Sequence, residues 1–557
     1  MALDENIYKL RLEKLKQIEA LGQRVYPTKY SVLQTIGFLR DKYANSSAEQ
    51  LDAERPKVQV AGRITGLRLM GKAGFAHLQS TSRLDRVGER QIQIYVKKDA
   101  VGEKGFELYK LFDIGDIIGA QGYLFRTRTG ELSIHVEELT FLAKDLLPLP
   151  EKWHGLTDVE LRYRQRYVDL AINPEIREVF LKRTELIRSM RRFMEEHWFI
   201  EVETPMMQPV AGGAVAKPFV THHNALDMDL YLRIAPELYL KRLLVGGFDR
   251  VFEINRNFRN EGLSTRHNPE FTMLEFYQAY TDYQGVMDLT QQLMTQAAKD
   301  VTGGTKTTWT IKEGEKEVIH ELDWANWQRM TMREAIILYW PNGCGGAPSL
   351  PEFSNLGAFI QRLKSAADSA RQTGESLAGD EVQEIRKNLL FREVFFKAMA
   401  GALERGIGDL GKAIAEVFES VAEEHLIQPT IIYEFPTAVS PLSKQKADDP
   451  DWTERFEIFA GKMEISNGFS ELNDPEDQRR RFEQQLRERE RGDEEAHQMD
   501  EDYIRALSYG MPPAGGVGVG VDRLAMLLTD SHTIRDVILF PLLRPEKVST
   551  AEDAEKK

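Results

Sequence analysis

The chain has 557 residues, of which 42% are hydrophobic and 29% charged, proportions typical of a soluble globular protein with several domains. This composition excludes a disordered, collagen-like or membrane-embedded protein. A single cysteine, Cys344, excludes an internal disulfide and a cysteine-based zinc cluster. Because we find neither a signal-peptide pattern nor a run of ~18 apolar residues, we expect a cytoplasmic protein with no membrane partner.

The formal net charge of −14 is unevenly distributed along the chain. Residues 1–144 contain 23 Lys and Arg against 18 Asp and Glu, which gives +5 and leaves −19 on the remainder. Nucleic-acid binding depends on Lys and Arg that contact phosphates. Residues 1–144 are therefore better suited than the rest of the chain to bind nucleic acid, although the net charge of the whole chain argues against such binding.

The first 144 residues predict a helical extension followed by a small barrel. Residues 4–21 have apolar side chains at helical spacing, so we expect residues 1–57 to form an extension that includes this helix. Five short segments of alternating hydrophobicity follow within residues 58–142, separated by turns that contain glycine. This pattern predicts a five-stranded barrel of the oligonucleotide-binding (OB) type over residues 58–144, a fold that binds single strands.

One barrel residue, Phe75, is a candidate platform for stacking on a base. Arg63, His77 and Gln79 occupy neighbouring strand positions and would supply polar contacts to RNA. The alternation is equally consistent with a Phe75 side chain inside the barrel.

Residues 145–174 are expected to form a linker, and Asn173-Pro174-Glu175 then begins a long helix that runs to about His197. Residues 251–280 follow as an antiparallel strand pair. Alternation puts Glu253, Asn255, Asn257 and Arg259 on one face of its first strand, and Phe271, Met273, Glu275 and Tyr277 together on its second. Burying such a polar face is costly without a ligand, so this pair is the first candidate site.

Two later segments carry further candidate residues. In residues 455–472, Glu457 and Glu464 flank a turn and would suit Mg²⁺, although Glu464 needs a bulge to face the same way as Asn467. Solvated strand acids are the alternative. In residues 514–530, a strand with glycine at every second position leads into a helix, where Asp522 and Arg523 would meet a phosphate-bearing ligand.

These segments together resemble the class II aminoacyl-tRNA synthetases of the lysine, aspartate and asparagine subgroup, and most closely its lysine members. Residues 199–205 resemble the first motif of the class, 258–271 the second and 518–523 the third. The resemblance implies an α+β, multidomain protein: an OB-fold anticodon-binding domain and, over residues 175–557, a catalytic domain built on an antiparallel sheet. Residues 345–411 make a helical insertion longer than the bacterial pattern, and Ser466 stands where that pattern has glycine.

The resemblance also implies an activity: ATP-dependent activation of L-lysine to lysyl-adenylate with release of diphosphate, then transfer to tRNA(Lys) with release of AMP. It implies Mg²⁺ as cofactor and a homodimer formed through the first motif. Arg259 and Arg523 would be catalytic. The implied ligand-binding residues are, for ATP, Arg259, Glu261, His267, Phe271 and Arg523; for lysine, Gly213, Glu237, Glu275, Tyr277, Asn467, Phe469 and Glu471; for Mg²⁺, Glu457 and Glu464; and for tRNA, Phe75, Arg63 and Gln79.

Lysine is favoured over aspartate because Glu237, Glu275 and Glu471 are carboxylates beyond those that ATP chemistry needs, and a cationic side chain seeks anionic partners. Two other functions compete with this one. The chain could be an ATP-dependent ligase that modifies a protein or a free amide, or an RNA-binding protein without catalysis. The intact barrel argues against the first, and the set of Arg259, Glu457, Glu464 and Arg523 argues against the second.

Overall fold

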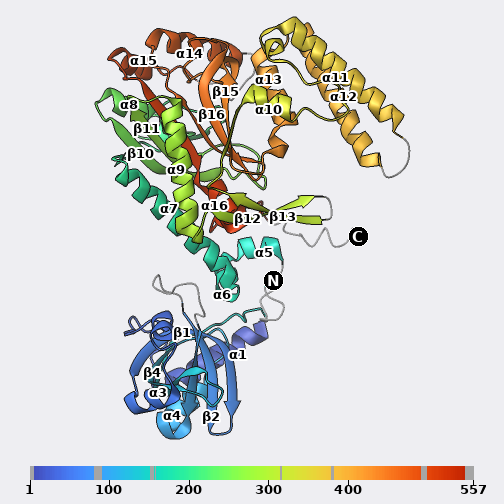
Figure 1. Ribbon diagram of the computed structural model, residues 1–557. Coiled ribbons are helices and arrows are strands. Elements are labelled where there is room, and N and C mark those ends of the chain that lie inside the picture. Colours follow the sequence, from blue (N-terminus) through green and yellow to red (C-terminus); the bar gives the residue numbers. More distant parts are fainter. Residues whose placement is uncertain are drawn as a thin grey trace, which may run out of the picture. The chain divides into compact units, whose positions relative to one another are not determined.

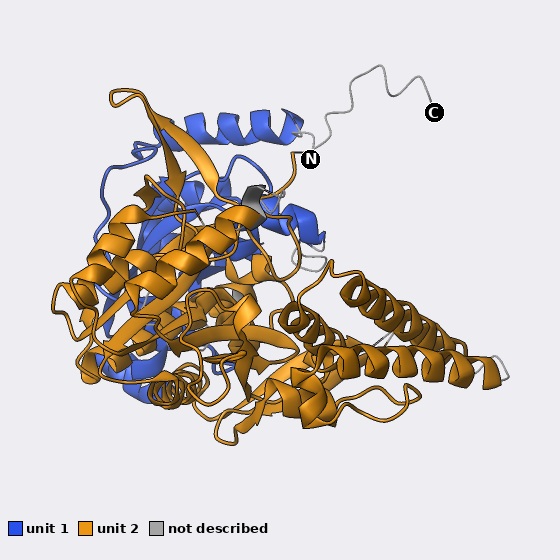
Figure 2. Ribbon diagram, turned by 90° about the horizontal axis from the view of Figure 1, so that it is seen from above, with its two compact units in different colours: residues 1–174 blue, residues 175–557 orange. Residues whose placement is uncertain are grey.

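The computed structural model describes residues 5–80, 91–150, 156, 158–313, 316–377, 382–490 and 498–545. The chain divides into two compact units, residues 1–174 and 175–557 (Figure 2). Both units combine helices with strands, so the predicted α+β, multidomain class is confirmed. No helix in these ranges is long and apolar enough to cross a membrane.

A closed five-stranded barrel with strand order β1-β2-β3-β5-β4 forms the centre of unit 1 (Figure 1). Its strands are β1 (Lys57–Met70), β2 (Ala73–Gln79), β3 (Gln91–Lys97), β4 (Ile117–Arg126) and β5 (Leu132–Ala143). Alternate side chains fill the interior, as Ile92, Ile94 and Val96 of β3 do. The barrel predicted from period-two alternation is therefore confirmed.

Short helices accompany the barrel. They are α1 (Glu5–Ala20), α2 (Ile36–Lys42), α3 (Ala48–Glu54), α4 (Lys98–Leu111), α5 (Val159–Arg164) and α6 (Arg166–Ile172). The predicted first helix thus begins at Glu5, and Asp4 lies outside the described residues. The last two helices fall within residues 145–174, where the sequence predicted only a linker.

An eight-stranded sheet with order β14-β15-β16-β17-β18-β11-β10-β6 forms the centre of unit 2. Its strands are β6 (Ile200–Glu201), β10 (Arg250–Phe258), β11 (Glu270–Ala279), β14 (Gln328–Thr331), β15 (Thr430–Pro436), β16 (Trp452–Ala460), β17 (Met463–Ser470) and β18 (Ala514–Gly520). The six inner strands pair antiparallel, as predicted, whereas β14 and β6 pair parallel at the two edges. The sheet is therefore mixed rather than purely antiparallel.

Helices surround this sheet (Figure 1). They are α7 (Pro174–Glu196), α8 (Glu237–Val245), α9 (Tyr283–Thr302), α10 (Met332–Leu338), α11 (Leu356–Ser376), α12 (Gln383–Glu404), α13 (Leu410–Val421), α14 (Pro475–Glu490), α15 (Glu501–Ser508), α16 (Val521–Thr529) and α17 (Ile534–Val537). Helices α11 and α12 lie side by side and project from the sheet in both views. Two small sheets complete the unit: β12 (Lys306–Glu313) with β13 (Lys316–Asp323), and β7 (Met207–Gln208) with β9 (Met228–Leu232) and β8 (Phe219–His223).

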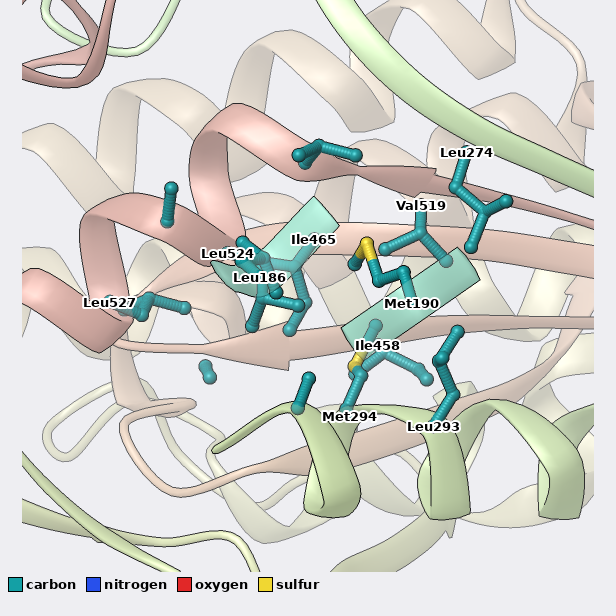
Figure 3. Close-up of a cluster of buried hydrophobic side chains, with 14 of the residues drawn as sticks. Leu186, Met190, Leu274, Leu293, Met294, Ile458, Ile465, Val519, Leu524 and Leu527 are labelled. Carbon is teal, nitrogen blue, oxygen red and sulfur yellow. The ribbon is translucent and has the colours of Figure 1, made fainter. Parts of the chain in front are cut away.

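The core of unit 2 lies on the face of the sheet that α7, α9 and α16 cover (Figure 3). Met190 of α7, Met294 of α9 and Leu524 of α16 belong to one buried cluster with Leu274 of β11. Because strand side chains alternate, burying Leu274 and Phe276 on this face directs Glu275 and Tyr277 to the opposite face. The hydrophobic core thus determines which polar residues share the other side of the sheet.

We expect Leu274→Ala to lower the free energy of unfolding by about 2–5 kcal/mol, because it removes a fully buried side chain from the core. Urea titration followed by circular dichroism measures this change. The matched control is Leu390→Ala on α12, where the leucine is 59% exposed, with an expected change below about 0.5 kcal/mol. Equal losses for both variants would contradict the assignment of the core.

Candidate active site

A cavity of about 330 Å³ lies against the inner strands of unit 2, on β11, β17 and β18. It brings together all of the residues predicted for ATP, namely Arg259, Glu261, His267, Phe271 and Arg523. Most of those predicted for lysine line it too: Gly213, Glu237, Glu275, Tyr277, Asn467 and Phe469. Of the residues predicted for ATP, lysine and Mg²⁺, Glu457 and Glu471 do not line the cavity.

Strand register explains how segments far apart in the sequence meet here. Tyr277 of β11 pairs with Gly516 of β18, and Gly516 pairs in turn with Phe469 of β17. A Cβ atom on Gly516 would lie 2.1 Å from Glu471 Oε1 and 2.4 Å from Tyr277 Cε1. Glycine at this position therefore makes room for the carboxylate and the phenol.

One end of the cavity is cationic. The Arg259 guanidinium lies 5.1 Å from the centre of the Phe271 ring, so an aromatic face and a cation are already stacked there. Arg523 donates to the Glu464 carbonyl oxygen at 2.7 Å and lies 3.1 Å from His267 Nε2. Burial and the Arg523 guanidinium lower the pKa of His267, so its ring is neutral at pH 7.

A buried contact holds strand β11 and helices α16 and α7 together at this end. Asp522, the first-turn acid of α16, accepts from the Thr272 backbone N–H at 2.7 Å and from Arg183 of α7 at 2.5 Å. Thr272 follows Phe271, and Asp522 precedes Arg523. One carboxylate therefore sets the spacing between the Phe271 ring and the Arg523 guanidinium.

The other end is anionic and deeply buried. The Lys241 ammonium contacts Glu237 Oε1 at 2.5 Å, and it also forms an ion pair with Glu471. In the part of the chain that the structure describes, the only hydrogen bond to the Glu275 carboxylate comes from the Tyr277 hydroxyl, at 3.4 Å. Burial, with the Glu237 and Glu253 carboxylates nearby, raises the pKa of Glu275 to about 8.

Glu457 and Glu464 lie on adjacent strands beside the cationic end. The register between β16 and β17 shifts at Ile458/Phe459, so the bulge that the sequence required for Glu464 is confirmed. Glu464 reaches the cavity wall, whereas Glu457 lies behind it and accepts from Arg455 at 2.5 Å. Burial raises the pKa of Glu457 to about 8, with Glu464 adding to the rise. Each carboxylate has an arginine partner, Arg455 for Glu457 and Arg523 for Glu464. Both supply hard oxygen donors of the kind that Mg²⁺ shared with phosphates prefers.

In unit 1, aromatic rings gather on the outer face of the barrel. Phe75 is half-buried and lies 4.9 Å from Tyr95 between ring centroids, and His135 stacks on Tyr123 at 4.8 Å. Tyr95 and His135 join the two pairs at 5.5 Å. Arg63 donates to the Gly115 carbonyl, and Gln79 is largely buried. The partly exposed rings are therefore better placed than Arg63 or Gln79 to meet a nucleobase.

Sequence reasoning did not identify Lys241, nor Tyr95 and His135. The spacing of four residues between Glu237 and Lys241 was a usable signal, since it places the two side chains together on a helix. Tyr95 and His135 carried the same period-two signal that singled out Phe75.

Comparisons with known proteins agree with this geometry. Residues 158–544 match a family described as tRNA synthetases class II (D, K and N), and residues 58–142 match one described as OB-fold nucleic acid binding domain. The lysine–tRNA ligase of Moorella thermoacetica is 48% identical over 545 residues, which cover 98% of this chain and 99% of that protein. The lysine–tRNA ligase of Burkholderia vietnamiensis is 50% identical over 548 residues, 98% of each chain.

We expect Glu275→Gln to stabilise the ligand-free protein, by roughly 1–3 kcal/mol at pH 8. The folded-state pKa of Glu275 is raised from its ordinary value of 4.5 to about 8, so this group costs the wild type stability as pH rises from 4.5 through 8. The neutral amide removes that cost. Urea unfolding at pH 5 and pH 8 measures it, and a variant no more stable than the wild type at pH 8 would contradict the burial of an under-neutralised Glu275.

Proposed function

We propose that this chain, which belongs to the class II tRNA synthetases (D, K and N), attaches L-lysine to tRNA(Lys) as a lysine–tRNA ligase. The observation that carries the proposal is a single cavity with buried carboxylates at one end and two arginines beside an aromatic ring at the other. An amino acid with a cationic side chain fits the first end, and ATP fits the second. Relatives of nearly equal length bear the name of this activity.

The first reaction joins lysine to AMP. A carboxylate oxygen of lysine attacks the α-phosphorus of ATP, the new P–O bond forms, and the bond to the bridging oxygen of diphosphate breaks. Arg259 would bind the α-phosphate and the lysine carboxylate, which stabilises the charge that develops at phosphorus. Phe271 and Arg523 would hold adenine between them, Glu261 would accept from its amino group, and His267 would lie near the terminal phosphates.

Catalysis here is positioning and charge neutralisation, since no protein nucleophile is needed. Glu457 and Glu464 would hold Mg²⁺, which would neutralise phosphate charge during transfer. In the second reaction, a hydroxyl of the terminal ribose of tRNA attacks the lysyl carbonyl and AMP leaves.

Lysine would lie with its α-ammonium at Glu237 and Glu275 and its ε-ammonium at Glu471 and Tyr277. Gly213, Asn467 and Phe469 would shape the slot between these ends. Gly213 lies beside Glu237, and a Cβ atom there would come within 3.0 Å of the Glu237 Cβ.

Residues 58–144 would bind the anticodon, residues 1–57 and 145–174 would be the extension and linker, and residues 175–557 the catalytic domain with an insertion at 345–411. The first motif would form a homodimer, which is supported by the exposed apolar side chains of Trp198 and Ile200 there. A role in translation places the protein in the cytoplasm.

We expect lysine, and none of the other standard amino acids at the same concentration, to drive rapid exchange of labelled diphosphate into ATP. Purified tRNA(Lys) should then be charged with lysine. Arg259→Ala should reduce exchange by at least about 100-fold, because it removes the guanidinium that stabilises the negative charge developing at the phosphorus under attack. Exchange driven by aspartate or asparagine, or no exchange at all, would refute the proposal.

We expect Phe75→Ala to weaken charging of tRNA(Lys) while diphosphate exchange stays unchanged. Loss of one stacking contact is worth ~1–3 kcal/mol, or roughly 5- to 100-fold in the KM for tRNA. The matched control is Phe38→Ala. Phe38 is a 46%-exposed phenylalanine of unit 1 that lies on α2, away from the rings of Phe75, Tyr95, Tyr123 and His135. Equal KM values for tRNA in both variants would contradict a role for Phe75 in RNA binding.

A further inference from the structure

Lys241 of α8 is completely buried beside the proposed lysine slot, and no step of the proposed reaction uses it. Its ammonium contacts Glu237 one helical turn earlier at 2.5 Å and also forms an ion pair with Glu471, the residue that follows β17 by one position. The Phe469 ring covers it, with the ring centroid 5.3 Å from Nζ. A buried ammonium is costly unless it is paired, so these contacts are what hold Lys241 there.

The position of Lys241 determines what it can contact. It does not line the cavity, and neither does Glu471, whereas Glu237, Tyr277 and Phe469 do. The ammonium is covered by Phe469 and is paired with Glu237 and Glu471. Any effect on a ligand must pass through Glu237 and Glu471.

The charges at this end balance only when a ligand is counted. When all three are ionised, as pairing with a ligand requires, Glu237, Glu275 and Glu471 contribute three negative charges, and Lys241 contributes one positive charge. The neighbouring guanidinium groups are committed elsewhere, Arg233 to Glu253 at 2.7 Å and Arg455 to Glu457 at 2.5 Å. The remaining two negative charges match the α- and ε-ammonium groups of one lysine, whose own carboxylate lies at Arg259 in the proposed function.

We propose that Lys241 is a positioning residue that sets the charge of the lysine slot: it holds Glu237 and Glu471 ionised and in place, so that the slot accepts a ligand with two ammonium groups. This inference rests on the proposed function. Without Lys241, the Glu471 carboxyl would also keep a proton in the ligand-free protein, in addition to the proton that Glu275 carries below about pH 8, and would have to release it to pair with the ε-ammonium. Lysine binding would then release one more proton than it does in the wild type.

The surroundings of the pair support this proton count. Burial raises the pKa of Glu471, and the Lys241 ammonium opposes this rise more than any other neighbouring group does. The titratable and charged groups that face Lys241 and Glu471 come from four places in the fold: Glu237 and Arg242 of α8, Glu275 and Tyr277 of β11, Arg455 of β16 and Tyr503 of α15. None of these would replace the lost ammonium, because each arginine is already paired with a carboxylate.

The test is Lys241→Met in the full chain, with diphosphate exchange measured at saturating ATP between pH 6.5 and 8.5. We expect the KM for lysine at pH 7 to rise about tenfold or more, while the KM for ATP changes less than about twofold. The plot of log KM for lysine against pH should be steeper by about one unit than that of the wild type, the mark of one additional proton. The inference would be overturned if Lys241→Met kept the wild-type KM for lysine or the wild-type slope. It would also be overturned if the variant raised the KM values for lysine and ATP equally.

Three further variants separate positioning from loss of structure. Lys446→Met removes an ammonium that is paired with Glu434, outside the cavity, and should leave both KM values unchanged. The double variant of Lys241→Met with Glu471→Gln should raise the KM for lysine by less than the product of the two single effects, because Lys241 acts in part through that carboxylate. Lys241→Arg keeps a cation, so its plot of log KM for lysine against pH should have the slope of the wild type. This variant keeps the inference testable if Lys241→Met fails to fold. An additive double variant, or a slope in Lys241→Arg one unit steeper than that of the wild type, would overturn the inference.

The wild type separates this inference from the proposed function. Absence of lysine-dependent exchange in the wild type would refute both. Exchange in the wild type that Lys241→Met does not alter would refute only the role of Lys241.

Discussion

More carboxylate groups than cationic groups are buried on one face of the unit 2 sheet, and the site depends on this excess of negative charge. Glu237, Glu275 and Glu471 lie together with the ammonium of Lys241, and burial raises the pKa of all three carboxyl groups. Each uncompensated charge costs the fold several kcal/mol. The opposite face, where α7, α9 and α16 bury the apolar side chains of the strands, offsets this cost. The hydrophobic core thus stabilises a fold in which buried carboxylates lack enough cationic partners, and a cationic ligand would supply the missing positive charge.

The same sheet keeps the two charge types apart. Along β11, Phe271 lies at the cationic end with Arg259, and Glu275 and Tyr277 lie at the anionic end. In the proposed function, a zwitterionic substrate with a cationic side chain would fit between them in one orientation, with its carboxylate toward Arg259. That orientation brings the attacking oxygen to the position where the α-phosphate would bind. The arrangement therefore accounts for both selection and orientation of the amino acid.

The sequence predicted the features that depend on local periodicity. Alternation predicted the barrel, the polar face of residues 251–280 and the bulge between Glu464 and Asn467, because a strand exposes its pattern directly. The contact between Lys241 and Glu471 joins residues 230 positions apart and was missed. The crowding of Glu471 and Tyr277 around Gly516 depends on strand order, and so does the stack of Tyr95 on Phe75. Neither strand order nor side-chain direction can be deduced from the spacing of residues along one segment.

Direct binding of amino acids to the ligand-free chain tests the central claim, that the slot selects a second ammonium group. Calorimetric titration at pH 7.5 would compare lysine with norleucine, which has the same chain length and lacks the ε-ammonium, and with aspartate. We predict that lysine binds and that norleucine binds at least about 100-fold more weakly, because it leaves a buried carboxylate unpaired. Aspartate should show no binding. Equal affinity for lysine and norleucine would contradict the account.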